Sequence, residues 1–370
     1  DLKGRVRVVY QNKTPTGAYR AVGQPIGCVV IEQLLDIAAA ELDLDPVDIR
    51  RRNNLGAEDL PIKAAGGLEI DNISLDACLT TILAKMDYEK LRQDQVEARQ
   101  QGIYRGIGLA TFVEQTAVGA GLYGPAGTRV SAQEGCALRL DPSGVIRGST
   151  SVTDQGQGTL TGIQQVIAET LGVRFDAVYT ESGDGGTTPY GGGSGASRGL
   201  AIGGEAARLA SLDLRKKILG VAAAISQVSP EKLSMVAGEI FKDGKSLMDL
   251  AELAQIVHFR QYTLPQDLDF EMNVTRHFLP RSFPYFMANG IQASYLEVDL
   301  GTGSIKLLDH WIVGDCGTVV NPMLVDEQLR GGIVQGLGAA LYEQAIYDNS
   351  GQLLTATLAD YAVPIASAMP

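Results

Sequence analysis

Residues 145–180 read VIRGSTSVTDQGQGTLTGIQQVIAETLGVRFDAVYT and join two β-rich runs through a glycine-bearing turn and an amphipathic run. The β-branched residues of Val145–Val152 predict a strand. Apolar residues at positions 160, 163, 167 and 171 have helical spacing, so we expect a helix over Thr159–Leu171 that Gly172 ends. A second strand is expected near Ala177–Thr180. This alternation predicts an α+β (mixed α/β) fold with mixed sheets and packed helices.

The rest of the chain alternates in the same way. Ile26–Leu42 is apolar on nearly every side, which predicts a buried helix. The pattern becomes β-rich near Ile107, so we expect two subdomains, residues 1–105 and 106–370. Further strands are expected at Arg5–Tyr10, Leu109–Val113 and Cys136–Leu140, and a hairpin is expected from Ile291–Leu300 and Ser304–Val313. Further helices are expected over Val47–Asn53, from a Ser74 cap to Gln101, from the end of the glycine-rich stretch Gly183–Gly204 to about Ala224, and over Val325–Tyr342. Short helices are expected within Pro230–Val257.

Composition excludes several classes of function. The 370 residues carry a net charge of −12 and no basic run, so nucleic acid is not an expected partner. No stretch of about 18 apolar residues predicts a membrane span. The four cysteines form no C-x-x-C pair and the three histidines have no ligand spacing, so we expect buried reduced thiols and no metal bound by protein side chains. The chain starts without Met or a targeting signal, which resembles a cut end.

Three glycine-bearing turns, each expected to open a helix, are the informative motifs. They are Asp154–Thr159, Gly193–Gly199 and Asn321–Gly332. Glycine allows close approach of the backbone to a ligand, and a helix N-terminus presents unpaired N–H groups to an anion. Gln157 and Gln328 add side-chain amides that can recognise the edge of a heterocycle. Together the turns predict a site for a phosphate-bearing heterocyclic cofactor.

Four blocks of sequence resemble one enzyme family in their order and spacing. They are GAYRAVGQP at residues 17–25, LDPVDIRRRN at 44–53, the GQGT and ASR segments at 156–159 and 196–198, and the run from Asp315-Cys-Gly317 through Asn321-Pro322 and Gln328 to Gln335-Gly-Leu-Gly338. This arrangement is similar to the molybdopterin-binding large subunits of the xanthine dehydrogenase, aldehyde oxidase and aerobic carbon monoxide dehydrogenase family.

The resemblance implies a molybdenum-dependent oxidoreductase that hydroxylates an aldehyde, an N-heterocycle or a similar small molecule with oxygen from water. It implies molybdopterin in its cytosine dinucleotide form, with no protein ligand on the molybdenum. It also implies FAD and [2Fe-2S] clusters on partner subunits or domains in a dimer of heteromers. Because such a large cofactor is inserted in the cytoplasm, the resemblance makes the cytoplasm the default compartment, with the periplasm as the alternative. Carried over by position, the residues implied to bind the cofactor are Tyr19, Arg20, Ala21, Gly156, Gln157, Gly158, Thr159, Ala196, Ser197, Arg198 and Gln328.

The chain also departs from the family pattern. Ala21 stands where a glycine is usual, and Glu327 stands where the family commonly has a glycine before Gln328. The family's catalytic glutamate would lie beyond Pro370, so no catalytic residue can be named and the chain alone is expected to be inactive.

Two other classes of function remain open. One is a non-catalytic cofactor-binding or assembly module, either a split subunit or a fragment. The other is a serine hydrolase, because Gly195–Gly199 fits the G-x-S-x-G elbow with Ser197 as nucleophile, although no strand is expected before it. A G-x-G-x-x-G match at Gly119–Gly124 precedes a proline and a strand, so it does not predict a dinucleotide site.

Overall fold

The computed structural model describes residues 3–5, 7–15, 17–125 and 127–368, and the chain folds into two compact units. Unit 1 combines Asp1–Glu114 with Met287–Pro370, and unit 2 is the continuous segment Gln115–Phe286. The subdomain division expected at residues 105/106 falls inside unit 1. Each unit packs helices against its own sheet, which confirms the α+β fold.

Unit 1 is built on a three-stranded sheet in the order β12-β11-β3. β11 and β12 form the antiparallel hairpin expected from the sequence. Helices α2, α3 and α4 cover one face through a buried cluster that includes Leu79, Ile82 and Ile291. The elements of unit 1 are α1 (Gln24–Glu41), α2 (Pro46–Asn53), β1 (Ile62–Lys63), β2 (Glu69–Ile70), α3 (Leu75–Met86), α4 (Tyr88–Gln100), β3 (Tyr104–Thr116), β11 (Phe286–Val298), β12 (Ile305–Asp315) and α9 (Pro322–Leu341).

Helix α1 forms where it was expected, but the prediction that it is buried is wrong. Only Glu32 and Ala39 are buried, and Ile26 and Ile31 are 72% and 58% exposed. The side of α1 that packs against the rest of unit 1 is narrow. It is also partly polar, because Glu32 pairs at 2.8 Å with the fully buried Arg50 of α2. Helix α1 is therefore apolar on nearly every side, yet only one side of it packs within unit 1.

Two other expectations for unit 1 need correction. The helix expected from Ser74 to Gln101 is interrupted at Asp87, which has a φ of 52° and separates α3 from α4. Ser74 does not cap α3, because its hydroxyl donates to Asp315 on β12, 2.7 Å away. Of the strand expected at Arg5–Tyr10, Val6 lies outside the described residues, and Arg7–Tyr10 belongs to no sheet of the described chain.

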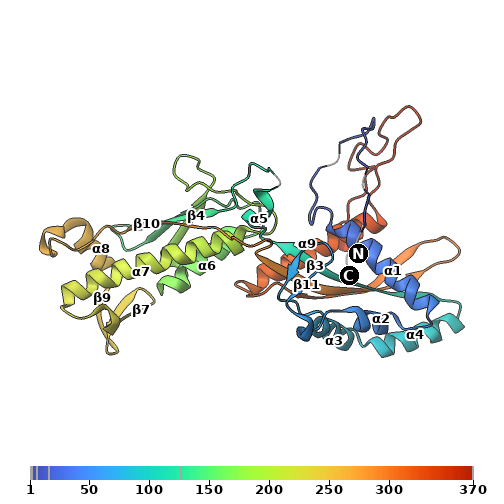
Figure 1. Ribbon diagram of the computed structural model, residues 1–370, viewed down its shortest axis with the longest axis horizontal. Coiled ribbons are helices and arrows are strands. Elements are labelled where there is room, and N and C mark those ends of the chain that lie inside the picture. The colour runs from blue at the N-terminus through green and yellow to red at the C-terminus, as the bar shows by residue number, and fades with distance from the viewer. Residues whose placement is uncertain (1–2, 6, 16, 126, 369–370) are drawn as a thin grey trace. The chain divides into compact units, whose positions relative to one another are not determined.

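Unit 2 contains the unit predicted from residues 145–180. Strands β5 and β6 are parallel and α6 connects them, within a four-stranded sheet ordered β10-β4-β5-β6. Helices α6 and α7 lie side by side along this sheet and share its buried core (Figure 1). The elements are α5 (Ala120–Tyr123), β4 (Glu134–Leu140), β5 (Ile146–Thr150), α6 (Thr159–Leu171), β6 (Val178–Ser182), α7 (Gly204–Ser226), β7 (Leu233–Val236), β8 (Glu239–Lys242), β9 (Lys245–Asp249), α8 (Leu250–Phe259) and β10 (Asn273–Phe278).

The prediction of short helices over Pro230–Val257 is largely wrong. Strands β7, β8 and β9 form an antiparallel sheet there, and only α8 follows as a regular α-helix. The sequence contained the signal, since Leu233, Met235 and Ile240 are buried with the two-residue period of strands. Asp243 and Gly244 have φ values of 50° and 76°, as a tight hairpin turn requires.

Candidate cofactor site

Two of the glycine-bearing turns meet in unit 2. The Thr153 hydroxyl lies 3.4 Å from the Ser194 hydroxyl, which also donates to the Thr153 carbonyl. A Cβ added to Gly199 would lie 3.1 Å from the Thr159 side chain. The turn before α6 and the turn before α7 are therefore neighbours, although about 40 residues separate them along the chain.

The N-terminus of α6 is already occupied by a carboxylate of the chain itself. Asp154 accepts hydrogen bonds from the backbone N–H groups of Gly156 and Leu160, at 2.8 and 2.9 Å. Desolvation works to raise the pKa of Asp154, but these bonds and those from Gly158 and Thr159 outweigh it, so the pKa lies below its usual range. The side-chain oxygen of Gln157 also accepts from within this turn. The positive end of α6 is thus largely neutralised before any ligand binds.

The entrance to α7 differs, because its backbone is strained and open. Ala196 and Ser197 have φ values of 48° and 54°, two consecutive non-glycine residues in the left-handed region. Cβ atoms added to Gly193 and Gly195 would meet nothing within 4 Å, so the backbone there is accessible to a ligand. A π-helical turn, Gly199–Gly203, follows and continues into α7. The first N–H groups of such a helix lack intrahelical partners and favour an anion.

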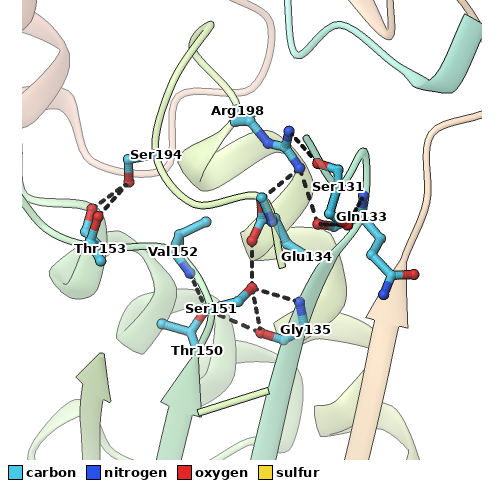
Figure 2. A network of polar contacts seen from close by, with 11 residues as sticks. Ser131, Gln133, Glu134, Gly135, Thr150, Ser151, Val152, Thr153, Ser194 and Arg198 are labelled. Atoms are coloured by element: carbon cyan, nitrogen blue, oxygen red, sulfur yellow. Dashed lines mark hydrogen bonds and ion pairs between the residues drawn. The ribbon is translucent and has the colours of Figure 1, made fainter. Parts of the chain in front are cut away.

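Arg198 follows the open turn directly, yet its side chain is enclosed. Its guanidinium pairs at 2.6 Å with Glu134, and the two side chains are 1% and 0% exposed. It also donates to the carbonyls of Ser131 and Gln133, at 2.9 and 3.1 Å (Figure 2). Its Nε is buried without a partner in the described part of the chain. Arg198 was predicted to bind the cofactor, and the structure places its terminal nitrogens on other groups of the chain.

Glu134, which was not among the predicted site residues, is the centre of this network (Figure 2). Its carboxylate accepts from the Gly192 N–H at 3.2 Å and from the Ser151 hydroxyl. A Cβ on Gly191 would come within 2.3 Å of this carboxylate, so glycine is required for the loop to pass. The available signal was a glutamate at the head of the mostly apolar strand Glu134–Leu140, whose only other charged residue is Arg139, because a buried charge needs a partner.

The remaining predicted site residues lie in unit 1. Arg20 donates to the carbonyl of Gln328 on α9 at 2.8 Å, which joins two predicted residues that are 308 positions apart. Ala21 and Val22 have φ values of 68° and 54°. Ala21 therefore has the backbone conformation that favours the glycine usual at this position of the family. Nearby, burial raises the pKa of Glu114 and the charge of Arg20 opposes that rise.

Protein-ligated metal and nucleophilic chemistry find no support in the described residues. Nowhere in them do three His, Cys, Asp or Glu side chains gather as a metal site. Cys78 and Cys136 are buried, Cys28 is partly buried and Cys316 is exposed, so the expected burial of the thiols holds only in part. Within the described part of unit 2, no histidine or carboxylate is hydrogen-bonded to Ser197, and irregular backbone precedes it. In the described ranges, no helix is both long and apolar enough to cross a bilayer.

Comparison with known proteins gives one consistent family. Two family models, each described as a molybdopterin cofactor-binding domain, match residues 81–370 and 1–54. The nicotine 6-hydroxylase large subunit of Paenarthrobacter nicotinovorans is 31% identical over 97% of this chain and 44% of its own length. The carbon monoxide dehydrogenase large chain of Hydrogenophaga pseudoflava is 31% identical over 99% of this chain and 46% of its own length.

Solved structures agree with these matches. Quinoline 2-oxidoreductase from Pseudomonas putida 86 superposes with a TM-score of 0.86 at 34% identity, over 96% of this chain and 45% of that one. The Cu,Mo-containing CO dehydrogenase has a TM-score of 0.84 at 25% identity, over 95% of this chain and 44% of its own. The chain thus spans slightly less than half the length of the relatives it matches.

Proposed function

Because the chain belongs to the family of molybdopterin-binding large subunits that includes xanthine dehydrogenase and carbon monoxide dehydrogenase, we propose that it forms the cofactor-binding portion of a molybdenum hydroxylase. The observation that carries the proposal is the open, strained entrance to α7, beside the turn that opens α6. Access to the backbone at Gly193 and Gly195 fits the pyrophosphate of a dinucleotide better than an uncharged group.

The residues divide between two tasks in this proposal. The N–H groups around Ala196, Ser197 and Gly199 receive the pyrophosphate of a cytosine dinucleotide, while Gly156, Gln157, Gly158 and Thr159 contact the pterin side. Asp154 already neutralises the α6 N-terminus, so the negative charge of the cofactor is better placed at α7. In unit 1, Tyr19, Arg20, Ala21 and Gln328 form the second group of contacts. When bound, the molybdenum centre supplies the redox chemistry by which a substrate carbon is hydroxylated with oxygen from water.

The proposal for the substrate, the partners and the compartment is made by analogy with the family. The names of two relatives contain the N-heterocycles nicotine and quinoline, so an N-heterocycle or an aldehyde is the proposed substrate class. Electrons leave the site through [2Fe-2S] and FAD partners, in a cytoplasmic dimer of heteromers. A cofactor-binding or assembly module without chemistry of its own is the second candidate.

Cofactor analysis tests the proposal directly. The chain, purified from a host that makes both the guanine and the cytosine dinucleotide of molybdopterin, is expected to contain about one molybdenum per chain and to release CMP on acid hydrolysis. Release of GMP would overturn the cytosine assignment, and absence of pterin and molybdenum would overturn cofactor binding by this chain.

A further inference from the structure

The strained turn Ala196–Ser197 and the enclosed Arg198 are adjacent in the chain and opposite in character. We propose that Glu134 is a positioning residue, which holds Arg198 and thereby fixes the entrance of α7 in its ligand-binding conformation. This inference rests on the proposed function, in which that entrance receives the pyrophosphate. Glu134 then acts on the cofactor only through Arg198 and the turn that Arg198 terminates.

The turn needs an external restraint. Left-handed backbone at two successive non-glycine residues is unfavourable and persists only where the surroundings impose it. Glycines at 191–193 and 195 lower the intrinsic stiffness of the loop. Two backbone hydrogen bonds fix part of it, from Ala117 N–H to the Ala196 carbonyl at 2.8 Å and from Arg198 N–H to the Gly195 carbonyl at 3.1 Å.

Glu134 connects this turn to the four-stranded sheet of unit 2. It is the first residue of β4, which is paired with β10 on one side and β5 on the other. Its carboxylate accepts from the Ser151 hydroxyl (Figure 2). It also accepts from the Gly192 N–H at 3.2 Å, so the restraint runs from the sheet to Gly192 within the glycine loop and to Arg198 after it. Moving either side chain away would leave the other charge buried without its partner. The ion pair is therefore a strong restraint.

The geometry also separates positioning from direct binding. Both terminal nitrogens of Arg198 are used by Glu134, Ser131 and Gln133, and the Tyr123 ring lies 6.0 Å from the guanidinium carbon. An anion has little access to the guanidinium, because the Arg198 side chain is only 1% exposed. The turn, in contrast, has open space at Gly195. The enclosed guanidinium therefore shapes the site, and the backbone beside it contacts the ligand.

Hydrogen exchange of the ligand-free chain tests the inference without any cofactor. The reporters are the amides of Ala117, Arg198 and Ile202, which donate to the turn or within it. In Glu134→Gln, which keeps the side-chain shape and removes the charge, these amides are expected to exchange at least about tenfold faster under native conditions. Amides of β5 should change much less. Exchange at the reporters within about twofold of the original rate, or a rise shared equally with β5, would overturn the inference.

A matched control and a milder variant complete the experiment. Glu205→Gln removes one partner of the more exposed Glu205–Arg208 pair on α7, and it should leave the three reporters unchanged. If Glu134→Gln does not fold, Ser151→Ala removes a hydroxyl donor to Glu134 and leaves both charges in place. It should accelerate the same amides by a smaller factor, and unchanged rates in it would equally overturn the inference.

Binding of inorganic pyrophosphate distinguishes this inference from the proposed function. The original chain and Glu205→Gln are expected to bind pyrophosphate equally, and Glu134→Gln at least about tenfold more weakly. If the original chain binds none, the pyrophosphate role of the turn fails while the exchange result still decides whether Glu134 fixes it. If Glu134→Gln binds as tightly as the original chain, the positioning role is overturned and the proposed function stands.

Discussion

Four non-glycine residues with positive φ occur as two pairs, and each pair lies in a predicted cofactor segment. Ala21 and Val22 follow Arg20, while Ala196 and Ser197 precede Arg198. A β-branched residue such as Val22 is rarely found in this conformation. Strain of this kind concentrates where the surroundings hold the backbone for a ligand, so the two pairs support the cofactor segments independently of sequence similarity.

Replacing Ala21 with glycine should stabilise unit 1. The backbone at φ 68° is unfavourable for alanine and accessible to glycine, so a gain of about 1 kcal/mol is expected for Ala21→Gly. Ala38→Gly, in the last turn of α1, serves as the control and should cost up to about 1 kcal/mol. Urea denaturation followed by circular dichroism measures both, and a loss of stability in Ala21→Gly would show that the alanine is not strained.

The sequence predicted which segments form the candidate site better than it predicted how their side chains are used. Glycine turns before α6 and α7 are local patterns, and they were recognised as such. The partners of Arg198 are not local, because Glu134 lies on a different strand and enclosure depends on how the sheet packs. The same holds for Arg20 and Gln328, whose contact requires the completed fold of unit 1.

At the scale of single elements, local sequence patterns predicted the structure correctly where no tertiary contact opposed them. The α6 helix has the predicted limits, and Gly172 ends it with a φ of 80°. Predictions failed where packing overrode local preference: Ser74 donates across to β12 instead of capping α3, and Asp87 interrupts a helical pattern. In the β7 to β9 region, the two-residue period was present and was mistaken for short helices.

The capping carboxylate of α6 predicts a pH dependence. Because the pKa of Asp154 is lowered in the folded chain, its stabilisation is complete above the unfolded aspartate value of about 3.9 and is lost as the pH falls through the folded value. Asp154→Asn should cost about 1 kcal/mol at neutral pH, and less as the pH approaches that acid range. Denaturation from pH 7 to pH 3 measures the difference. Asp267→Asn, an exposed position, is the control, and a cost for Asp154→Asn that does not vary with pH would contradict the account.

The exposure of α1 predicts that an isoleucine on this helix contributes much less to stability than a buried isoleucine on α3. Ile82 of α3 is fully buried, so Ile82→Ala should cost about 2–5 kcal/mol. Ile31 of α1 is 58% exposed, and Ile31→Ala should change the free energy of unfolding by less than about 0.5 kcal/mol. Both are measured in the same chain by urea denaturation. A large cost at Ile31 would show that other protein surface covers this side of α1 in solution.

At the scale of the whole chain, unit 2 is a continuous insertion between two strands of unit 1. The Thr116 hydroxyl donates to the Phe286 carbonyl at 3.0 Å, so the insertion begins and ends at one place. The buried cluster of unit 2 is drawn entirely from residues 136–272, and it unites both sheets with α6, α7 and α8. Sequence composition alone did not reveal this arrangement, because the return of the chain to unit 1 at Met287 leaves no local mark.

Unit 2 should therefore fold when it is made alone as residues 115–286. Its length is that of an ordinary domain and its core borrows nothing from unit 1, so a single cooperative urea transition is expected. A shorter piece, residues 115–271, lacks β10, which pairs with β4 along its whole length and packs against α7. That piece should lose cooperativity, because removing β10 leaves one edge of β4 unpaired and exposes the side of α7 that β10 covers. If both pieces unfold without a transition, the fold of unit 2 depends on unit 1, and the turns at α6 and α7 are fixed by the whole chain.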